Sequence, residues 1–262
     1  MENSVKFSVF SHNILSNSRI RMSFSTQQNH YLDWNYRSEK LCLDMLTNEP
    51  DIVCLQEVES YDYFSQKLKN HHGNFDKTSD FPFGVSTFVK KNLFLFEETI
   101  KVPFVEKNFV GTIMVVSYHK RSKFLLISNV LFASVESSIQ QPQLAILISI
   151  IDNTIKKIQK FSETAQIGIL MCGDFNFLPY TPLYNSVLDS PLSFQSAYGE
   201  HFNNKEPDFT VYSDKKNQTQ DFVFFSKNIF QHSFLSIPKP LSVLPSKDYP
   251  SDHFYLFCKM EF

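Results

Sequence analysis

The sequence is poor in glycine, has few cysteines and contains no long apolar run. Only 6 of its 262 residues are glycine, and no Gly/Ser/Pro-rich linker divides the chain. The cysteines Cys42, Cys54, Cys172 and Cys258 are scattered without a C-x-x-C pair. This scatter argues against a zinc site and a disulfide framework, so we expect free buried thiols in a reducing compartment. The longest apolar stretch, residues 144–151, is far too short to span a bilayer.

Neither positive nor negative charge is in large excess. The formal net charge is −2, whereas a protein that grips long duplexes usually carries a basic surplus. The balance favours a short or single-stranded ligand, or a substrate whose phosphates meet a metal ion. Residues 1–6 lack the basic and apolar regions of a secretion signal. We therefore expect a soluble cytoplasmic or nuclear protein with no membrane partner.

Short apolar runs, typical of buried strands, are what the chain does contain. They lie at residues 6–15, 51–58, 84–90, 111–119, 123–132, 167–172, 221–226 and 252–260. Amphipathic stretches at 34–46, 61–69 and 140–159 predict helices. Because nothing interrupts this pattern, we expect residues 1–262 to form a single domain. Its predicted class is α/β (α+β), a two-layer β-sandwich flanked by helices.

Polar side chains stand at the ends of several of these apolar runs, where each would need a partner if buried. They are Asn13, Glu57, Asp174, Asn176, Asp221, Asp252 and His253. Any one of them alone could be a cap or a turn residue. Because several strand ends all carry polar side chains of this kind, we infer instead that these side chains form one common site. Carboxylates with amides suit Mg²⁺, and an Asp–His pair supplies acid–base chemistry, a combination that phosphate ester hydrolysis requires.

The motifs around these residues follow one another in a characteristic order. They are Asn13, Gln56-Glu57, Gly173-Asp174-Phe175-Asn176, Asp221 and Ser251-Asp252-His253. Together they resemble the signature series of the endonuclease/exonuclease/phosphatase superfamily. The segments 32–37, 51–59, 174–184 and 206–210 are similar to the deadenylase, nocturnin and angel proteins. The resemblance extends over residues 6–260 and implies the DNase-I-like fold.

A metal site is the first implication of this resemblance. Glu57 would be the principal ligand of Mg²⁺, for which Mn²⁺ could substitute. Asn13 and Asp252 would lie close to the ion, in direct or water-mediated contact. Asn13 would thereby also approach the substrate phosphate.

The resemblance also implies roles in the chemical step. Asp174 would position or deprotonate the attacking water, and Asn176 would hold the phosphate or that water. His253 would stabilise the pentavalent phosphorus or move a proton, oriented by Asp221. The alternative for Asp221 and His253 is a satisfied buried pair without chemistry.

The chain departs from the superfamily pattern at a central strand. Relatives carry Asn-Thr-His there, and alignment back from Gln143 places Ile127-Ser128-Asn129 at that motif. Asn129 would still donate a hydrogen bond to phosphate, but its amide does not take up a proton at neutral pH as an imidazole does. We therefore expect activity reduced by about 10²–10³-fold, as for the loss of one transition-state donor, or an inactive protein.

A second departure concerns the base clamp of poly(A)-specific relatives. A proline and an aromatic residue sandwich the base in those proteins, whereas Ser134 and Lys216 stand at these places here. Stacking contributes roughly 1–3 kcal/mol per base, so adenine preference is not implied. Tyr212 or Phe209 could supply a face instead.

Three functions follow as hypotheses. The first is a Mg²⁺-dependent phosphodiesterase of mRNA decay, a 3′-exoribonuclease that hydrolyses single-stranded RNA, including poly(A), to 5′-nucleotides. The second is a nucleotide or 2′,3′-cyclic phosphate phosphatase of the nocturnin or angel type. The third is a weakly active or inactive pseudoenzyme that binds RNA or scaffolds a complex. The expected partners are RNA or a nucleotide, with subunits of a deadenylase complex.

Overall fold

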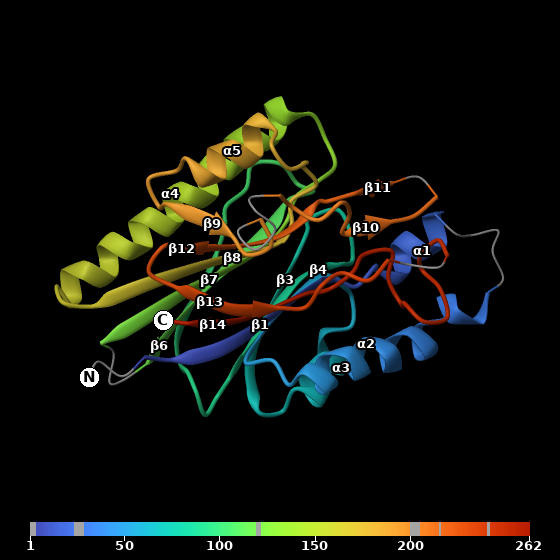
Figure 1. Cartoon of the computed structure of the whole chain (residues 1–262), viewed down its shortest axis with the longest axis horizontal. Helices are drawn as coiled ribbons and strands as arrows, with labels where there is room; N and C mark the ends of the chain where they lie inside the picture. The colour runs from blue at the N-terminus through green and yellow to red at the C-terminus, as the bar shows by residue number, and fades with distance from the viewer. Residues whose placement is uncertain (1–3, 24–28, 119–121, 200–204, 215, 240–241) are drawn as a thin grey trace.

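Two six-stranded sheets packed face to face form the centre of the molecule (Figure 1). The computed structural model describes residues 4–23, 29–118, 122–199, 205–214, 216–239 and 242–262. The first sheet has the order β13 (Phe230–Phe234), β14 (Leu256–Glu261), β1 (Lys6–Asn13), β2 (Ile52–Val58), β4 (Gly84–Lys90) and β3 (His71–Lys77). The second has the order β5 (Leu95–Lys101), β6 (Val110–Tyr118), β7 (Lys123–Leu131), β8 (Gln166–Asp174), β12 (Asp221–Ser226) and β9 (Phe194–Ser196).

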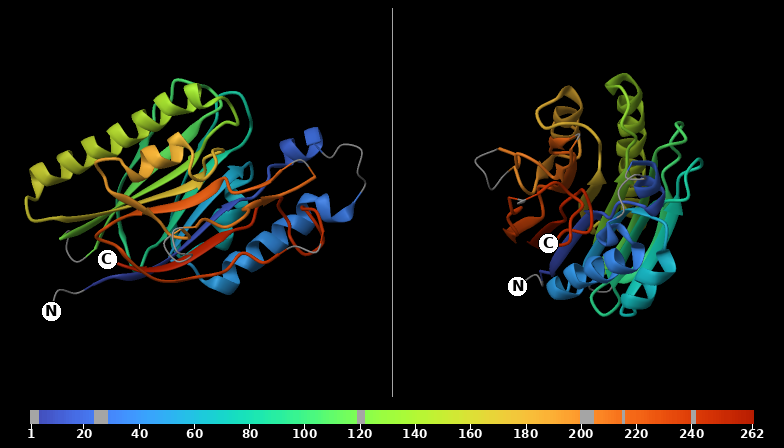
Figure 2. Two further views of the ribbon diagram at one scale, coloured as in Figure 1. Left: turned by 45° about the horizontal axis from the view of Figure 1, so that its top comes forward. Right: turned by 90° about the vertical axis from the view of Figure 1, so that its right-hand side faces the viewer.

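Helices cover the outer faces of both sheets (Figure 2). On the first sheet lie α2 (Trp34–Asn48) and α3 (Tyr61–Lys67), and on the second lie α4 (Ser137–Phe161) and α5 (Pro182–Leu188). The short α1 (Asn17–Ser23), the 3₁₀ turn His30–Leu32 and the hairpin of β10 (Val211–Tyr212) and β11 (Asn217–Gln218) complete the described elements. An apolar core that includes Val9, Ile127 and Leu170 fills the space between the sheets. The predicted sandwich flanked by helices is confirmed.

Each predicted strand and helix has a counterpart in the structure, with ends that differ by a few residues. Position 119, where the strand that became β6 was expected to end, lies outside the described residues. The largest difference is at β14, which begins at Leu256 and not at residue 252. Asp252 and His253 lie in the preceding loop, where His253 makes an isolated bridge to Val211. The site residues there are therefore held by a loop.

Four strands that the apolar runs did not predict are the edges of the two sheets. They are β3, β5, β9 and β13. Most residues of β3, β5 and β13 are half-buried or exposed, so their sequences are mixed in polarity. An edge strand has a neighbour on one side only, and its pairing is decided by the strand beside it more than by its own pattern.

The topology collects the polar strand ends at one end of the sandwich. Strand β1 runs parallel to β2, so Asn13 and Gln56 stand side by side. In the second sheet β12 runs antiparallel to β8, and its first residue Asp221 pairs with Asp174. The C-terminal ends of β1, β2 and β8 thus meet the start of β12, near α1 and the β10–β11 hairpin (Figure 1).

Gly173 permits the close approach of β8 to β7 directly beneath this end. Its φ of 145° is in a region that side chains rarely adopt. A Cβ at this position would lie 2.0 Å from the carbonyl oxygen of Val130. Asp174 is the next residue in the chain. The close approach at Gly173 therefore fixes the backbone position from which the Asp174 carboxylate extends.

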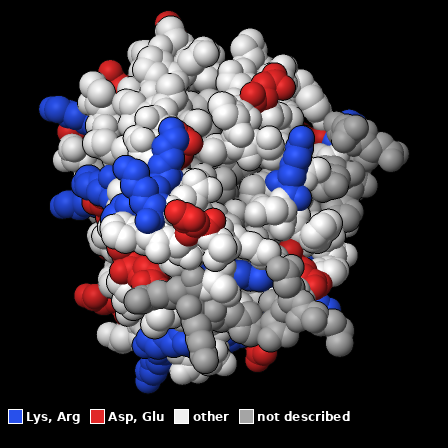
Figure 3. Space-filling model, turned by 90° about the vertical axis from the view of Figure 1, so that its left-hand side faces the viewer, with Lys and Arg blue, Asp and Glu red and all other residues white. Residues whose placement is uncertain are grey.

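The opposite end of the molecule, where both chain termini lie, carries charges of both signs (Figure 3). The lysines near the end of α4 form ion pairs there, Lys156 with Asp152 and Lys157 with Glu98. These contacts are those of a solvated face. Among the described helices, none combines the length and apolarity that a membrane crossing requires.

We expect Gly173→Ala to destabilise the fold by about 1–3 kcal/mol, because the new Cβ must displace backbone. Urea unfolding measures this change in the free energy of unfolding. The matched control is Gly168→Ala in the same strand, where a Cβ meets only side-chain carbons at 3.2 Å or more. Equal losses for the two variants would contradict the assigned role of Gly173.

Candidate active site

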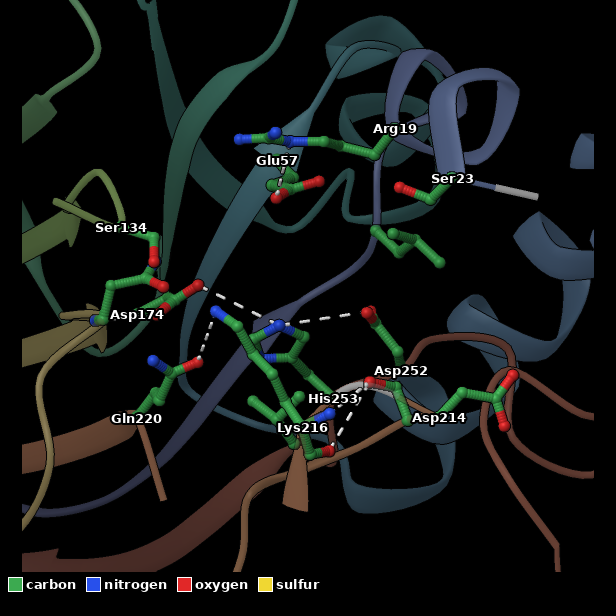
Figure 4. A pocket seen from close by; sticks show the side chains of 14 residues that line it. Arg19, Ser23, Glu57, Ser134, Asp174, Asp214, Lys216, Gln220, Asp252 and His253 are labelled. Carbon is green, nitrogen blue, oxygen red and sulfur yellow. Dashed lines mark hydrogen bonds and ion pairs between the residues drawn. The ribbon is translucent and has the colours of Figure 1, made fainter. Parts of the chain in front are cut away.

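A pocket opens at the end of the sandwich where the polar strand ends meet (Figure 4). Of the residues predicted from the sequence, those that line it are Glu57, Asp174, Asn176, Asp252 and His253. They come from both sheets and from the loop before β14. Glu57 and Asp174 therefore share one cavity, as the sequence hypothesis requires. Asn13 and Asp221 lie behind the wall, in contact with residues that line it.

His253 is held between carboxylates. Its Nδ1 donates to Asp221, 2.9 Å from Oδ2, and its Nε2 lies 4.0 Å from Oδ2 of Asp174 and 4.0 Å from Oδ1 of Asp252. Burial alone would lower the pKa of His253, but the charge and hydrogen bond of Asp221, with the charges of Asp252 and Asp174, outweigh it and raise this pKa to about 10. The imidazole is therefore cationic at neutral pH. Asp221 is fixed in turn by the hydroxyl of Thr210, which donates to its Oδ2.

Asp174 is poised to exchange a proton near neutral pH. Burial, then the charge of Asp221, raises the pKa of Asp174 to about 7, although His253 and Asn13 act in the opposite direction. Asn13 donates from Nδ2 to Oδ2 of Asp174 at 2.9 Å. The backbone N–H of Asn176 donates to Oδ1 at 3.0 Å. This carboxylate is oriented on both oxygens and has the pKa that suits a general base.

Glu57 enters the pocket through an irregularity in β2. The pairing of β2 with β4 shifts register between Gln56 and Val58, and Glu57 has a left-handed φ of 56°. Such a bulge turns a side chain away from the regular alternation of the strand. Its Oε2 accepts from the backbone N–H and the hydroxyl of Ser16 at 2.9 and 3.0 Å.

The oxygen donors at this end fit a hard divalent cation. Oδ1 of Asp252 is buried and has no hydrogen-bond partner, and burial raises the pKa of this carboxyl. A buried carboxylate oxygen without a donor is costly, and a cation shared with Glu57 would satisfy it. Ligand atoms of Asp174, Asp221 and His253 also lie within 4.8 Å of one another, so this acidic cluster with its histidine could hold a metal. A cationic imidazole repels an ion, which favours the Glu57 side of the pocket.

Asn176 and Asn13 are fixed by the backbone. Asn176, with a φ of 51°, donates from Nδ2 to the carbonyl of Phe132 at 2.9 Å and lines the pocket. Asn13 is fully buried, and its Oδ1 accepts from the N–H of Leu15. Asn13 therefore acts on the site through Asp174. Its predicted contacts with metal and phosphate, like the phosphate contact of Asn176, stay predictions.

The expectation that Asn129 donates to a substrate phosphate is corrected by the structure. Asn129 is fully buried between the sheets, where Nδ2 donates to the carbonyls of Leu55 and Ser86 and Oδ1 accepts from Gln56 at 2.8 Å. The residue of β7 that stands beside Asp174 is Leu131. Successive residues on one face of a strand are two positions apart, so Asn129 lies one step deeper than the pocket.

The base-clamp positions face the pocket without an aromatic ring. Ser134 and Lys216 both line it, and Nζ of Lys216 donates to Gln220 at 3.5 Å. Tyr212 and Phe209 pack against each other with ring centroids 5.1 Å apart, and neither lines the cavity. The described lining residues include no phenylalanine, tyrosine or tryptophan.

Arg37 is a structural residue of the site whose role the sequence analysis did not identify. Its fully buried guanidinium donates to the carbonyls of Ile14, Leu15 and Pro250. It thereby fastens the loop after β1 to the loop that carries Asp252. The only sequence signal is an arginine on the apolar face of an expected helix.

Residues 10–253 match the Endonuclease/Exonuclease/phosphatase family, and the chain belongs to it. Its relatives place it in the deadenylase, nocturnin and angel branch. It is 31 % identical over 201 residues to carbon catabolite repressor protein 4 homolog 3 of Arabidopsis thaliana, and 25 % identical over 259 residues to human nocturnin. These matches cover 72 % and 88 % of this chain, but 44 % and 59 % of the relatives.

Solved structures agree in fold. ANGEL2, a 2′,3′-cyclic phosphatase, superposes with a TM-score of 0.88 at 20 % identity over 100 % of this chain and 97 % of its own. The human nocturnin catalytic domain superposes with a TM-score of 0.78 at 23 % identity over 98 % and 96 %. The predicted endonuclease/exonuclease/phosphatase fold is therefore confirmed. The family is that of endonucleases, exonucleases and phosphatases, and the match includes every predicted site residue that lines the pocket.

Asp221→Asn should lower the pKa of His253 from about 10, because it removes the charge that favours the imidazolium. NMR titration of the His253 ring measures the shift. Glu261→Gln is the control, since Glu261 contacts His232 at a distance from the pocket. An unchanged His253 titration in Asp221→Asn would refute the assigned electrostatics.

Proposed function

We propose that this chain, residues 1–262 as one catalytic domain, is a Mg²⁺-dependent 3′-exoribonuclease that releases 5′-nucleotides from single-stranded RNA, including poly(A). The observation that carries the proposal is that Asp174 and His253 lie next to each other and share a pocket with Glu57. A carboxylate with a pKa of about 7 stands beside a cationic imidazole, next to oxygen donors for a cation. In-line attack on a phosphodiester uses these three elements.

The residues divide the chemical step between them. Asp174, oriented by Asn13, takes the proton of the attacking water. His253, kept cationic by Asp221, faces the charge that develops on the phosphoryl oxygens or the leaving oxygen. Glu57 and Asp252 would hold Mg²⁺, or Mn²⁺ in its place, which supplies charge neutralisation at the phosphate oxygens when bound. Asn176 would hold the phosphate or the water.

The setting we propose is mRNA decay in the cytoplasm or nucleus. One relative, 24 % identical over 98 % of this chain, is a probable CCR4-Not complex 3′-5′-exoribonuclease subunit of Vairimorpha ceranae. By analogy, the partners of this chain would be single-stranded RNA and subunits of a deadenylase complex. The near-neutral net charge agrees with a short stretch of bound RNA.

The second candidate is a nucleotide or 2′,3′-cyclic phosphate phosphatase. Lys216 favours this candidate, because a cation stands where poly(A)-specific relatives would have an aromatic ring that stacks on a base. The likeness to ANGEL2, a 2′,3′-cyclic phosphatase, supports it. A pseudoenzyme that binds RNA remains the third hypothesis, and an inert protein in the assays below would favour it.

We expect labelled oligo(A) to be shortened by the wild-type protein with Mg²⁺ and to stay intact when EDTA removes the metal. Asp174→Asn should lower kcat/KM by about 10²–10⁴-fold, the usual contribution of a general base. In the wild type, kcat/KM should rise as the pH passes about 7, where Asp174 loses its proton.

The matched control for this assay is Asp152→Asn, an exposed carboxylate on α4 that pairs with Lys156. It should retain wild-type activity. Absence of metal-dependent shortening, with Asp174→Asn equally inert, would reject the exoribonuclease.

A substrate panel separates the two enzymes. If the second candidate is correct, RNA ending in a 2′,3′-cyclic phosphate or a dinucleotide is hydrolysed faster than oligo(A). Lys216→Met should then lower kcat/KM for that substrate by about tenfold, as expected for a charged hydrogen bond to phosphate. Lys227→Met, an exposed lysine outside the pocket, is the control. Preference for oligo(A) would reject this candidate.

A further inference from the structure

Arg19 extends from α1 over the Glu57 side of the pocket (Figure 4). Its guanidinium carbon lies 5.3 Å from the ring centroid of Phe81 and 5.2 Å from that of Phe83. The two rings stack on each other and form a platform for the guanidinium. A guanidinium that contacts aromatic rings through its flat face still has the N–H groups at its edge available for hydrogen bonds.

Within the described part of the chain, no residue accepts a hydrogen bond from the side chain of Arg19. Its Nε is buried and has no hydrogen-bond partner, although the side chain as a whole is 41 % exposed. The nearest carboxylate oxygen is Oε1 of Glu57 at 3.6 Å, which is too long for a hydrogen bond. At Arg37, by contrast, Nε and one terminal nitrogen donate to backbone carbonyls. Arg19 therefore presents donors that an anion in the pocket would satisfy.

The end of β7, which lies beside Asp174, offers no side-chain donor of this kind among the described residues. Leu131, which stands beside Asp174, belongs to an apolar cluster with Phe83, Val85 and Val110. The amide on the same face of β7, that of Asn129, is fully engaged between the sheets. None of the described residues of β7 lines the pocket, whereas Arg19 does.

The backbone that carries Arg19 is tied to the end of β2. Ser16 donates to Glu57, and the N–H of Ser18 donates to Oε1 of Glu59 at 2.8 Å. The start of α1 is therefore held by Glu57 of β2 and by Glu59, which lies just after the end of that strand. This anchoring fixes the distance between Glu57 and the base of the Arg19 side chain, as a binding group requires.

We propose that Arg19 is a catalytic residue of this chain, whose guanidinium binds the non-bridging oxygens of the scissile phosphate and stabilises their charge in the transition state. This inference rests on the proposed phosphodiesterase function. A cation held by Glu57 would weaken the 3.6 Å ion pair between Glu57 and Arg19 and would leave the guanidinium edge free for the phosphate. The planar fork matches two phosphate oxygens at once, which an ammonium group does not do.

The experiment compares Arg19→Met and Arg19→Lys with Arg21→Met in the holoenzyme with Mg²⁺. Arg21 lies on the same helix, is exposed and does not line the pocket, so it controls for charge and for α1. Binding of inorganic phosphate is measured by calorimetry, and kcat and KM are measured with bis(4-nitrophenyl) phosphate. Arg19→Met should weaken phosphate binding by about tenfold and lower kcat/KM by about 10²-fold. Arg19→Lys should recover only part of either loss, and Arg21→Met should match the wild type.

The outcomes distinguish this inference from the proposed function. Wild-type phosphate affinity and kcat/KM in Arg19→Met would overturn the role of Arg19 while leaving the phosphodiesterase intact. Loss of thermal stability without loss of phosphate affinity would identify Arg19 as a structural partner of Glu57 and also overturn it. A wild-type protein that hydrolyses no phosphodiester, yet binds phosphate in an Arg19-dependent way, would reject the proposed function and support phosphate recognition by Arg19.

Discussion

Polar contacts across the seam between the two sheets fix how the sheets pack, because a buried amide or carboxylate that loses its partner is costly. Three such contacts cross the seam near the pocket: Asn13 with Asp174, Gln56 with Asn129, and Asp221 with His253. Each joins a residue of the first sheet, or of the loop that enters it, to one of the second. The pocket therefore exists only when the sheets are packed in register, since an unpaired buried amide or carboxylate costs several kcal/mol.

This constraint also sets the electrostatics of the site. The carboxylates of Asp174 and Asp252 are crowded in a buried space, which raises their pKa values, and the same charges keep His253 cationic. A site with an excess of negative charge suits a divalent ion, and an anionic substrate can bind once that ion neutralises the carboxylates that would otherwise repel it. The guanidiniums of Arg37 and Arg19 belong to this balance, one buried as a brace and one reaching the cavity.

Membership of the Endonuclease/Exonuclease/phosphatase family accounts for the common parts of the pocket but not for its rim. Glu57, Asp174, Asp252 and His253 stand in the family motifs. The rim is built by α1 and by the segment around the β10–β11 hairpin, from which Arg19 and Lys216 reach the cavity. Differences in substrate among relatives of one fold arise in such variable segments more often than in the strands that hold the catalytic groups.

The sequence alone determined the order of the polar motifs and the strands of the sandwich interior, because buried strands have apolar runs and each motif is local in the chain. The edge strands β3, β5, β9 and β13 were decided by their neighbours, since pairing there does not require a run of their own. Only the strand register placed Leu131 beside Asp174 and Asn129 one step deeper, a two-residue difference that reverses a predicted role. The surroundings of Arg19 likewise became visible only in three dimensions, because Phe81, Phe83 and Glu57 are distant from it in the chain and come close to it only in the fold.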